Sequence, residues 1–187
     1  MSSIVRKGTH VPLEELLVRG EPTPILRWGH SVLHRLARPV TAFDADLWDL
    51  LATLFATNRA AQGAGLAAPQ IGIDLAVFVY DCEDASGRRR QGLVCNPSIS
   101  PLPNAQRDVD LEGCLSLPGA SSPLARPDTA VSRGQDQFGQ PITVRGTGVL
   151  ARCLQHEVDH LDGILFLDRV SALKRTMLLK RWKKLRK

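Results

Sequence analysis

The stretch LQHEVDHLDG, residues 154–163, contains two histidines four positions apart and a glutamate directly after the first. On a helix, positions i and i+4 lie on one face about one turn apart, so His156 and His160 can direct ring nitrogens at one metal ion. Glu157 lies at a neighbouring angle, from which it can reach water on that ion. This is the H-E-x-x-H pattern of two ligands and a general base. The alternative is a polar helix end with two surface histidines.

A catalytic site of this kind needs a third protein ligand and an open position for water. A histidine six positions after His160 would complete one known pattern, but Phe166 occupies that position. The remaining candidates are carboxylates and the cysteines at positions 82, 95, 114 and 153. Cys114 follows Gly113, which lets the backbone approach closely. Taken alone, Cys114 fits a small buried core residue better than a ligand, because free cysteine is usually buried.

A second stretch with chemical potential is GAGLAAPQIG, residues 63–72. Its small side chains allow another backbone to lie against it. Pro69 would fix the direction of Gln70, whose amide can donate a hydrogen bond to a developing oxyanion. A simple helix-to-strand loop is the alternative, and composition alone favours it.

Length and composition predict one globular domain. The chain has 187 residues, 43% hydrophobic and 23% charged, which is typical of a protein with one sizeable core. The N-terminal region has no long apolar run, so neither a secretory signal nor a membrane span is expected. The four cysteines form no CxxC pair, which favours reduced thiols and a cytoplasmic location.

Positive charge is concentrated at the C-terminus. Residues 171–187 contain eight Lys and Arg and no acidic residue, whereas the rest of the chain holds 16 basic and 19 acidic side chains. Such a tail suits a polyanionic partner, although a solvated helix face is the commoner meaning.

Hydrophobic periodicity and turn residues predict an α+β fold. Residues 1–24 lack periodicity and are expected to form an irregular arm. Residues 43–61 have helical spacing, with Asp44 or Asp46 as the cap. Strands are expected at 75–81, at 92–99 with a break at Pro97, and as a pair within 129–146. Helices are expected from 148 to about 161, with Thr147 as cap, and over about 169–185. Neighbouring strands with few helices between them favour α+β over a parallel sheet.

Three stretches, taken together and in this order, resemble peptide deformylase: GAGLAAPQ (63–70), EGCLS (112–116) and QHEVDH (155–160). The resemblance extends from about Ile25 to the C-terminus. It implies antiparallel β-sheets surrounding a central metal-binding helix that bears H-E-x-x-H. It also implies a single catalytic domain over 25–187, including the basic C-terminal helix.

The resemblance assigns a role to each motif. It implies Cys114, His156 and His160 as metal ligands, and Glu157 as the acid and base. Gln70 and the backbone N–H of Leu115 would donate to the oxyanion. The implied substrate-binding residues are Gly63, Ala64, Gly65, Gly113, Val149 and Cys153. The implied metal is Fe²⁺, and Zn²⁺, Ni²⁺ or Co²⁺ can occupy such a site.

The implied reaction removes the formyl group from the N-terminal formylmethionine of new polypeptides and releases formate. The expected partners are N-formylmethionyl nascent peptides and, through the basic tail, the ribosome. No membrane partner is expected, and the protein is expected to be a monomer. Opposite charge and the resemblance also predict that Glu112 and Arg126 pair to hold the Cys114 loop.

Two positions depart from the family pattern. Ala64 stands where a larger aliphatic residue is usual, and Ser121 lies in a segment where an arginine often contacts substrate. Two other classes remain open from the sequence: a zinc peptidase that shares only H-E-x-x-H, and a catalytically silent relative that binds ribosomes through its tail. Comparing cleavage of formylated and unformylated peptides distinguishes a deformylase from a zinc peptidase. A formate-release assay distinguishes an active deformylase from a catalytically silent relative.

Overall fold

The computed structural model describes residues 11–185, with strands in the middle of the chain and helices toward both ends. The α-helices are α1 (Leu13–Arg19), α2 (Ala45–Ala60), α3 (Gly148–Leu161) and α4 (Ala172–Leu185). Short 3-10 helices lie at Ser31–His34, Ala68–Ile71 and Phe166–Asp168. The strands are β1 (Gly65–Ala67), β2 (Val77–Glu83), β3 (Arg89–Ser100), β4 (Arg107–Gly113), β5 (Ser121–Pro127), β6 (Thr129–Gln135) and β7 (Pro141–Thr147).

The strands form two antiparallel sheets, which confirms the predicted α+β class. One sheet has the order β1-β2-β3-β6-β7, and β4 pairs with β5 in the other. The turn at Ser86-Gly87 joins β2 to β3, and Gly139 lies in the turn between β6 and β7. Both glycines have positive φ, +75° and +80°, which glycine adopts without a steric penalty. The break expected at Pro97 is a bulge within one longer strand, because the register shifts between Cys95 and Ser98.

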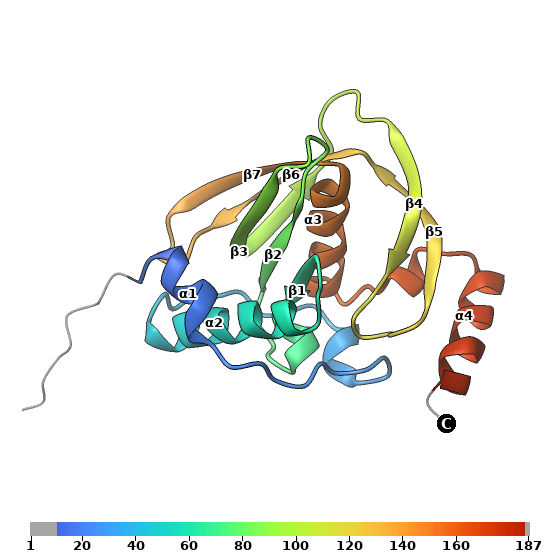
Figure 1. Ribbon diagram of the computed structural model, residues 1–187, viewed down its shortest axis with the longest axis horizontal. Helices are drawn as coiled ribbons and strands as arrows, with labels where there is room; N and C mark the ends of the chain where they lie inside the picture. The colour runs from blue at the N-terminus through green and yellow to red at the C-terminus, as the bar shows by residue number, and fades with distance from the viewer. Residues whose placement is uncertain (1–10, 186–187) are drawn as a thin grey trace, which may run out of the picture.

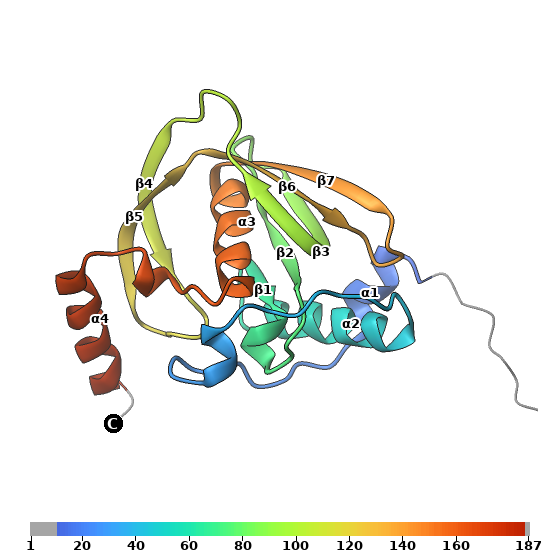
Figure 2. The same cartoon turned by 180° about the vertical axis from the view of Figure 1, so that it is seen from behind.

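Helix α3 is the centre of the molecule. Both views place it between the larger sheet and the β4–β5 pair (Figures 1 and 2). Its apolar stripe of Leu150, Leu154, Val158 and Leu161 is buried with residues of β2 and β3. Burial of one face at helical spacing fixes the rotation of the helix, and with it the direction of the polar residues between these positions.

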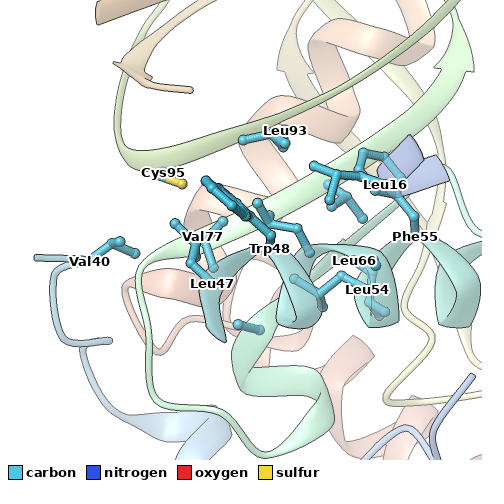
Figure 3. Packing of buried hydrophobic residues seen from close by; sticks show 14 of the residues in the cluster. Leu16, Val40, Leu47, Trp48, Leu54, Phe55, Leu66, Val77, Leu93 and Cys95 are labelled. Atoms are coloured by element: carbon cyan, nitrogen blue, oxygen red, sulfur yellow. The ribbon is translucent and has the colours of Figure 1, made fainter. Parts of the chain in front are cut away.

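Helix α2 packs against a second hydrophobic cluster. Leu51 and Leu54 are fully buried in one cluster with residues of β1, β2 and β3, and Figure 3 shows Leu54 in this cluster. The Asp44 side chain accepts a hydrogen bond from Leu47 N, as predicted for the cap. The indole of Trp48 donates to the Gln137 carbonyl oxygen at 2.8 Å. This helix therefore supports the strand that carries the glycine-rich motif.

The irregular arm expected for residues 1–24 is wrong for part of its length. Residues 1–10 lie outside the described residues, but Leu13–Arg19 form α1. Leu16 is fully buried in the α2 cluster. Seven residues are too few for a stable isolated helix, so tertiary packing rather than local periodicity stabilises α1.

The expected bounds of α3 are confirmed, but one expected capping bond and one expected helix boundary differ from the structure. Thr147 occupies the N-cap position of α3 but makes no capping bond there. Its hydroxyl accepts from Ala85 N at 3.2 Å instead. The C-terminal helix begins at Ala172 rather than near 169, because Phe166–Asp168 forms a separate 3-10 turn.

The buried residues of helix α4 hold it against the rest of the fold. Leu178 and Trp182 are buried, and Trp182 packs edge-on against Trp28 with ring centroids 5.8 Å apart. Leu173 and Met177 on the same helix are 72% and 63% exposed. The same cluster contains Cys114 and Leu117, so α4 supports the loop that follows β4.

Candidate metal and catalytic site

Three potential metal ligands converge beside the central helix. His156 and His160 lie one turn apart on α3, and their ring centroids are 4.8 Å apart. Cys114 reaches them from the end of β4, and its Sγ is 3.2 Å from His160 Nε2. The ligand atoms of all three lie within 4.8 Å of one another. Two imidazoles and a thiolate suit a tetrahedral divalent metal with one position open.

The electrostatics of this cluster favour the ligand form of cysteine. Burial opposes ionisation of the Cys114 thiol, but His160 and His156 outweigh it and lower its pKa well below the ordinary value. Burial also opposes the charged form of His156 and so acts to lower its pKa. Cys114 and Glu112 outweigh burial and raise that pKa well above its usual range. The site therefore stabilises a thiolate, which is the species that binds metal.

A buried carboxylate orients the first histidine. His156 Nδ1 lies 2.8 Å from Glu112 Oε1. A carboxylate only accepts, so Nδ1 carries the proton and donates it, which leaves Nε2 as the atom available to a metal. By contrast, His160 Nδ1 is buried with no hydrogen-bond partner among the described residues.

The predicted pair of Glu112 and Arg126 is confirmed, and it is buried rather than superficial. Arg126 donates through Nε and Nη2 to the two carboxylate oxygens of Glu112, at 2.7 Å each. It also donates from Nη1 to Asp159 Oδ2 at 3.0 Å. Arg152 adds a third contact to Glu112, 3.1 Å from Oε2. The sequence reading missed Asp159 and Arg152, because no local pattern indicates that they join this network.

Glu157 has the environment of a proton carrier. Its side chain is buried, and Oε2 has no hydrogen-bond partner among the described residues. Burial raises its pKa to about 7, although His156 and His160 act in the opposite direction. A carboxyl group with a pKa near neutrality can accept a proton and return it during one reaction cycle.

The Gln70 amide has a fixed direction. The side chain is 1% exposed, and Oε1 accepts from Ala67 N at 2.9 Å. Nε2 therefore faces the Cys114 loop, where it donates to Ser116 Oγ at 3.3 Å. In the same loop, Arg27 donates to the Leu115 carbonyl oxygen at 2.7 Å, which holds the Leu115 peptide in place.

A cavity of about 530 Å³ opens beside this cluster. It is lined by Gln62, Gly63, Ala64, Gly65, Gln70, Gly113, Cys114, Leu115, Leu117, Pro118, Gly119, Ala120, Ser121 and His156. Most of the expected substrate-binding residues are in this set. Two are not: Val149 is 50% exposed at the start of α3, and Cys153 is buried behind β1, where its thiol donates to the Ala64 carbonyl oxygen at 3.3 Å.

The wall of the cavity explains two glycines. A Cβ on Gly65 would lie 2.7 Å from Cys153 Sγ and 2.8 Å from Glu157 Oε1. A Cβ on Gly63 would lie 2.3 Å from Asn58 Oδ1. Because β1 is the edge strand of its sheet, its outer side can pair with an added extended chain. Gly65 thus lets β1 lie directly on α3, and Gly63 lets the chain before β1 pass close to α2.

An H-E-x-x-H helix, with a cysteine from a neighbouring strand end and a cavity at a sheet edge, is an arrangement that could hold a metal ion and is typical of metal-dependent hydrolases. The family model for polypeptide deformylase matches residues 22–176. The chain belongs to the peptide deformylase family, whose enzymes remove the formyl group from newly made polypeptides. This result confirms the resemblance read from the three motifs.

Individual relatives agree with the family model. Peptide deformylase 1 of Streptomyces avermitilis is 55% identical over 159 residues, which cover 84% of this chain and 74% of the relative. The crystal structure of a peptide deformylase from Legionella pneumophila is 39% identical with a TM-score of 0.78, covering 87% of this chain and 94% of that one. The Ehrlichia chaffeensis peptide deformylase in complex with actinonin is 31% identical with a TM-score of 0.81, covering 88% and 97%.

No helix between residues 11 and 185 combines the length and hydropathy that a membrane crossing would require.

Proposed function

We propose that Cys114, His156 and His160 hold one divalent metal ion, and that Glu157, Gln70 and the Leu115 N–H act beside it in deformylation. The observation that carries the proposal is the convergence of three donor atoms within 4.8 Å of one another, next to a buried glutamate. A bound divalent ion supplies Lewis acidity and lowers the pKa of a water ligand. The chain's own residues supply the remaining steps.

Glu157 is the proposed proton carrier. Its Oε2 takes a proton from the attacking water and later gives it to the amine nitrogen of the leaving methionine. The raised pKa of about 7 suits both halves of this cycle. Glu157 is a poor third ligand, because it lies at a different angle on α3 from the two histidines.

Gln70 and Leu115 are the proposed donors to the formyl oxygen. Gln70 Nε2 already faces the Cys114 loop, because Oε1 is held by Ala67 N. Donors that are fixed before the substrate arrives stabilise the developing negative charge without reorganisation. The Leu115 N–H would add a second donor from the adjacent peptide.

The substrate backbone is proposed to lie along β1 as an added strand, over Gly63 and Gly65 and opposite Gly113. The methionine side chain would enter the apolar region formed by Ala64, Val149, Cys153 and the His156 ring. Val149 is half-exposed, which is consistent with a position at the rim of that region rather than at its base. Ala64 leaves more room there than a larger aliphatic residue would.

The proposed native metal is Fe²⁺, by family resemblance. The donor set itself also fits Zn²⁺, Ni²⁺ and Co²⁺. Metal analysis of protein purified without oxygen would identify the ion. We further propose that the enzyme is a cytoplasmic monomer and that α4 contacts the ribosome through its exposed basic residues.

The proposal is tested by substituting Cys114. Cys114→Ala should abolish stoichiometric metal binding and formate release, whereas Cys153→Ala, a second buried cysteine near the site, should keep its metal. Full metal content in Cys114→Ala would overturn the ligand assignment. The wild-type enzyme should release formate from formyl-Met-Ala-Ser and leave the peptide bonds of Met-Ala-Ser intact. Peptide-bond cleavage would instead favour a zinc peptidase.

A further inference from the structure

A second cavity, of about 590 Å³, lies between β5, the C-terminal half of α3 and the beginning of α4. Both views place α4 beside β5 (Figures 1 and 2). The cavity shares no lining residue with the one beside Cys114. Its volume is within the range of small-molecule sites, roughly 300–1,000 Å³. It therefore has the size for a ligand other than the formylated peptide.

Most charged side chains around this second cavity are basic. Its lining includes Arg107, Arg126, Arg169 and Lys174, and Asp159 is the one acidic residue among the described residues that line it. Asp159 is already paired, because its Oδ2 accepts from Arg126 at 3.0 Å and from Arg169 at 3.1 Å. Both guanidinium groups therefore lie beside the same oxygen, and an anion that enters the cavity meets an excess of positive charge.

Several donors of these cations are not used within the fold. Arg169 is 45% exposed and gives two of its five N–H groups to Asp159. Arg107 donates from Nη2 to the Ala125 carbonyl oxygen at 2.7 Å. Among residues 11–185, neither Arg107 nor Lys174 has an ion-pair partner. The planar fork of a guanidinium matches the oxygen spacing of a phosphate, so the unused donors suit a phosphate group.

The remaining surface of the cavity is largely apolar. Pro123 and Ala125 come from β5, Ile99 from β3, and Val170 from the segment before α4. Apolar surface beside a few charged groups is the usual composition of a small-ligand site. A phosphate monoester carries nearly two negative charges at pH 7, whereas each diester of a nucleic-acid backbone carries one. The excess of positive charge therefore favours a monoester on a small molecule.

We propose that this second cavity binds a small phosphate monoester of about the size of a nucleotide. Arg107 and Arg169 donate to the phosphate oxygens, Lys174 adds positive charge, and the apolar residues contact the body of the ligand. Since the two cavities have no lining residue in common, this site and the proposed deformylase site can each be tested without the other.

Titration calorimetry on the full-length, metal-loaded protein tests the proposal. The probes are adenosine monophosphate and glucose 6-phosphate, and adenosine and glucose are their uncharged counterparts. We expect at least one of the two phosphates to bind with one molecule per chain, and neither counterpart to bind. Arg107→Gln with Lys174→Gln removes the two cations that have no ion-pair partner. This double variant should bind the phosphate at least roughly tenfold more weakly, as expected when hydrogen bonds to a charged group are lost.

Arg133→Gln with Arg145→Gln is the matched control, because it removes the same charge from exposed residues of β6 and β7. It should bind the phosphate as the wild type does. Absence of binding of both phosphates by the wild type, or equal binding by the two double variants, would overturn the proposal.

Two further measurements locate and identify the ligand. Cys114→Ala, which the proposed function leaves without metal, should still bind the phosphate; loss of binding there would place the phosphate on the metal and overturn the proposal. An RNA octamer without terminal phosphates offers diesters alone. Should it occupy the cavity more tightly than either monoester, the assignment to a small molecule would be wrong. Wild-type protein that binds the phosphate but releases no formate would count against the proposed function alone.

Discussion

Glu112 Oε1 lies 2.8 Å from His156 Nδ1, and the same carboxylate accepts a bidentate pair of hydrogen bonds from Arg126. The guanidinium therefore fixes the carboxylate, and the carboxylate fixes the imidazole. Outer partners of this kind keep a histidine in the tautomer that can bind metal. The pair that the sequence suggested as a brace for the Cys114 loop also orients a proposed ligand on α3.

Glu112→Gln is expected to weaken metal binding. The amide keeps the shape of the side chain but loses the charge that favours a proton on His156 Nδ1. Metal affinity should fall roughly 10- to 100-fold, as is typical when an outer partner is lost. Competition with a chelator measures the change. Asp110→Asn is the matched control, because Asp110 is exposed two residues earlier on β4; an equal loss in both variants would contradict the prediction.

Glu157→Gln is expected to keep its metal and to lose turnover by at least roughly 10²- to 10⁴-fold, the usual contribution of general acid–base catalysis. The pH profile gives a second measurement. A general base must be ionised, so wild-type kcat/KM should fall as pH decreases through the pKa of Glu157. Burial raises that pKa to about 7, and a bound cation would lower it, so the inflection should lie at or below pH 7.

The same acidic limb should be absent from the residual activity of Glu157→Gln. Glu83→Gln, at an exposed position on β2, should retain both the rate and the profile of the wild type. Loss of metal from Glu157→Gln would show that Glu157 is a ligand or a structural element.

Acid should destabilise the protein through Glu112. Burial opposes its ionised form, but Arg126 and His156 outweigh burial and hold the pKa below its ordinary value of 4.5. A carboxyl group whose folded pKa is depressed stabilises the fold above its unfolded pKa, and this stabilisation is lost as pH falls toward the folded pKa. The wild-type Tm should therefore decrease below about pH 4.5.

Arg126→Met should reveal the source of that stability. Removing one member of a buried ion pair leaves an uncompensated charge, at a cost of about 3–5 kcal/mol. The variant should unfold at a lower temperature than the wild type at pH 7. On acidification, its Tm should decrease by less than the Tm of the wild type does. Arg133→Met, an exposed position on β6, should change neither result. An unchanged Tm in Arg126→Met at pH 7 would refute the argument.

The sequence predicted those parts of the fold and site that local spacing determines. The i, i+4 spacing of His156 and His160 places both on one face of any helix, and in the structure their rings lie side by side on α3. Cys114 is 46 positions from His160 in the chain, and only the combined motifs linked them. The β4–β5 pair was not predicted, because β4 reads RDVDLEG and most of its residues are exposed. Such a strand is defined by its partner and not by its own hydrophobic pattern.

Charges on α4 are expected to mediate ribosome binding, but deletion of residues 175–187 is a poor test of that proposal. Trp182 is 2% exposed and packs on Trp28, and Trp28 N donates to the Ser116 carbonyl oxygen in the Cys114 loop at 2.9 Å. Deletion would uncover this loop, so hydrolysis of even a short formyl-peptide should suffer. Trp182→Ala alone should cost about 3–5 kcal/mol of stability.

Charge reversal separates the two effects. Lys180 and Lys184 are exposed one turn apart on α4, so Lys180→Glu with Lys184→Glu changes the surface and leaves Leu178 and Trp182 in place. We expect turnover of a short formyl-peptide to stay within about twofold, while co-sedimentation with ribosomes weakens at low salt, because contacts to phosphate depend on counterion release. Arg133→Glu with Arg145→Glu makes the same change of charge on exposed residues of β6 and β7. Equal co-sedimentation of both double variants and the wild type across a salt series would exclude the basic face of α4 as the ribosome contact.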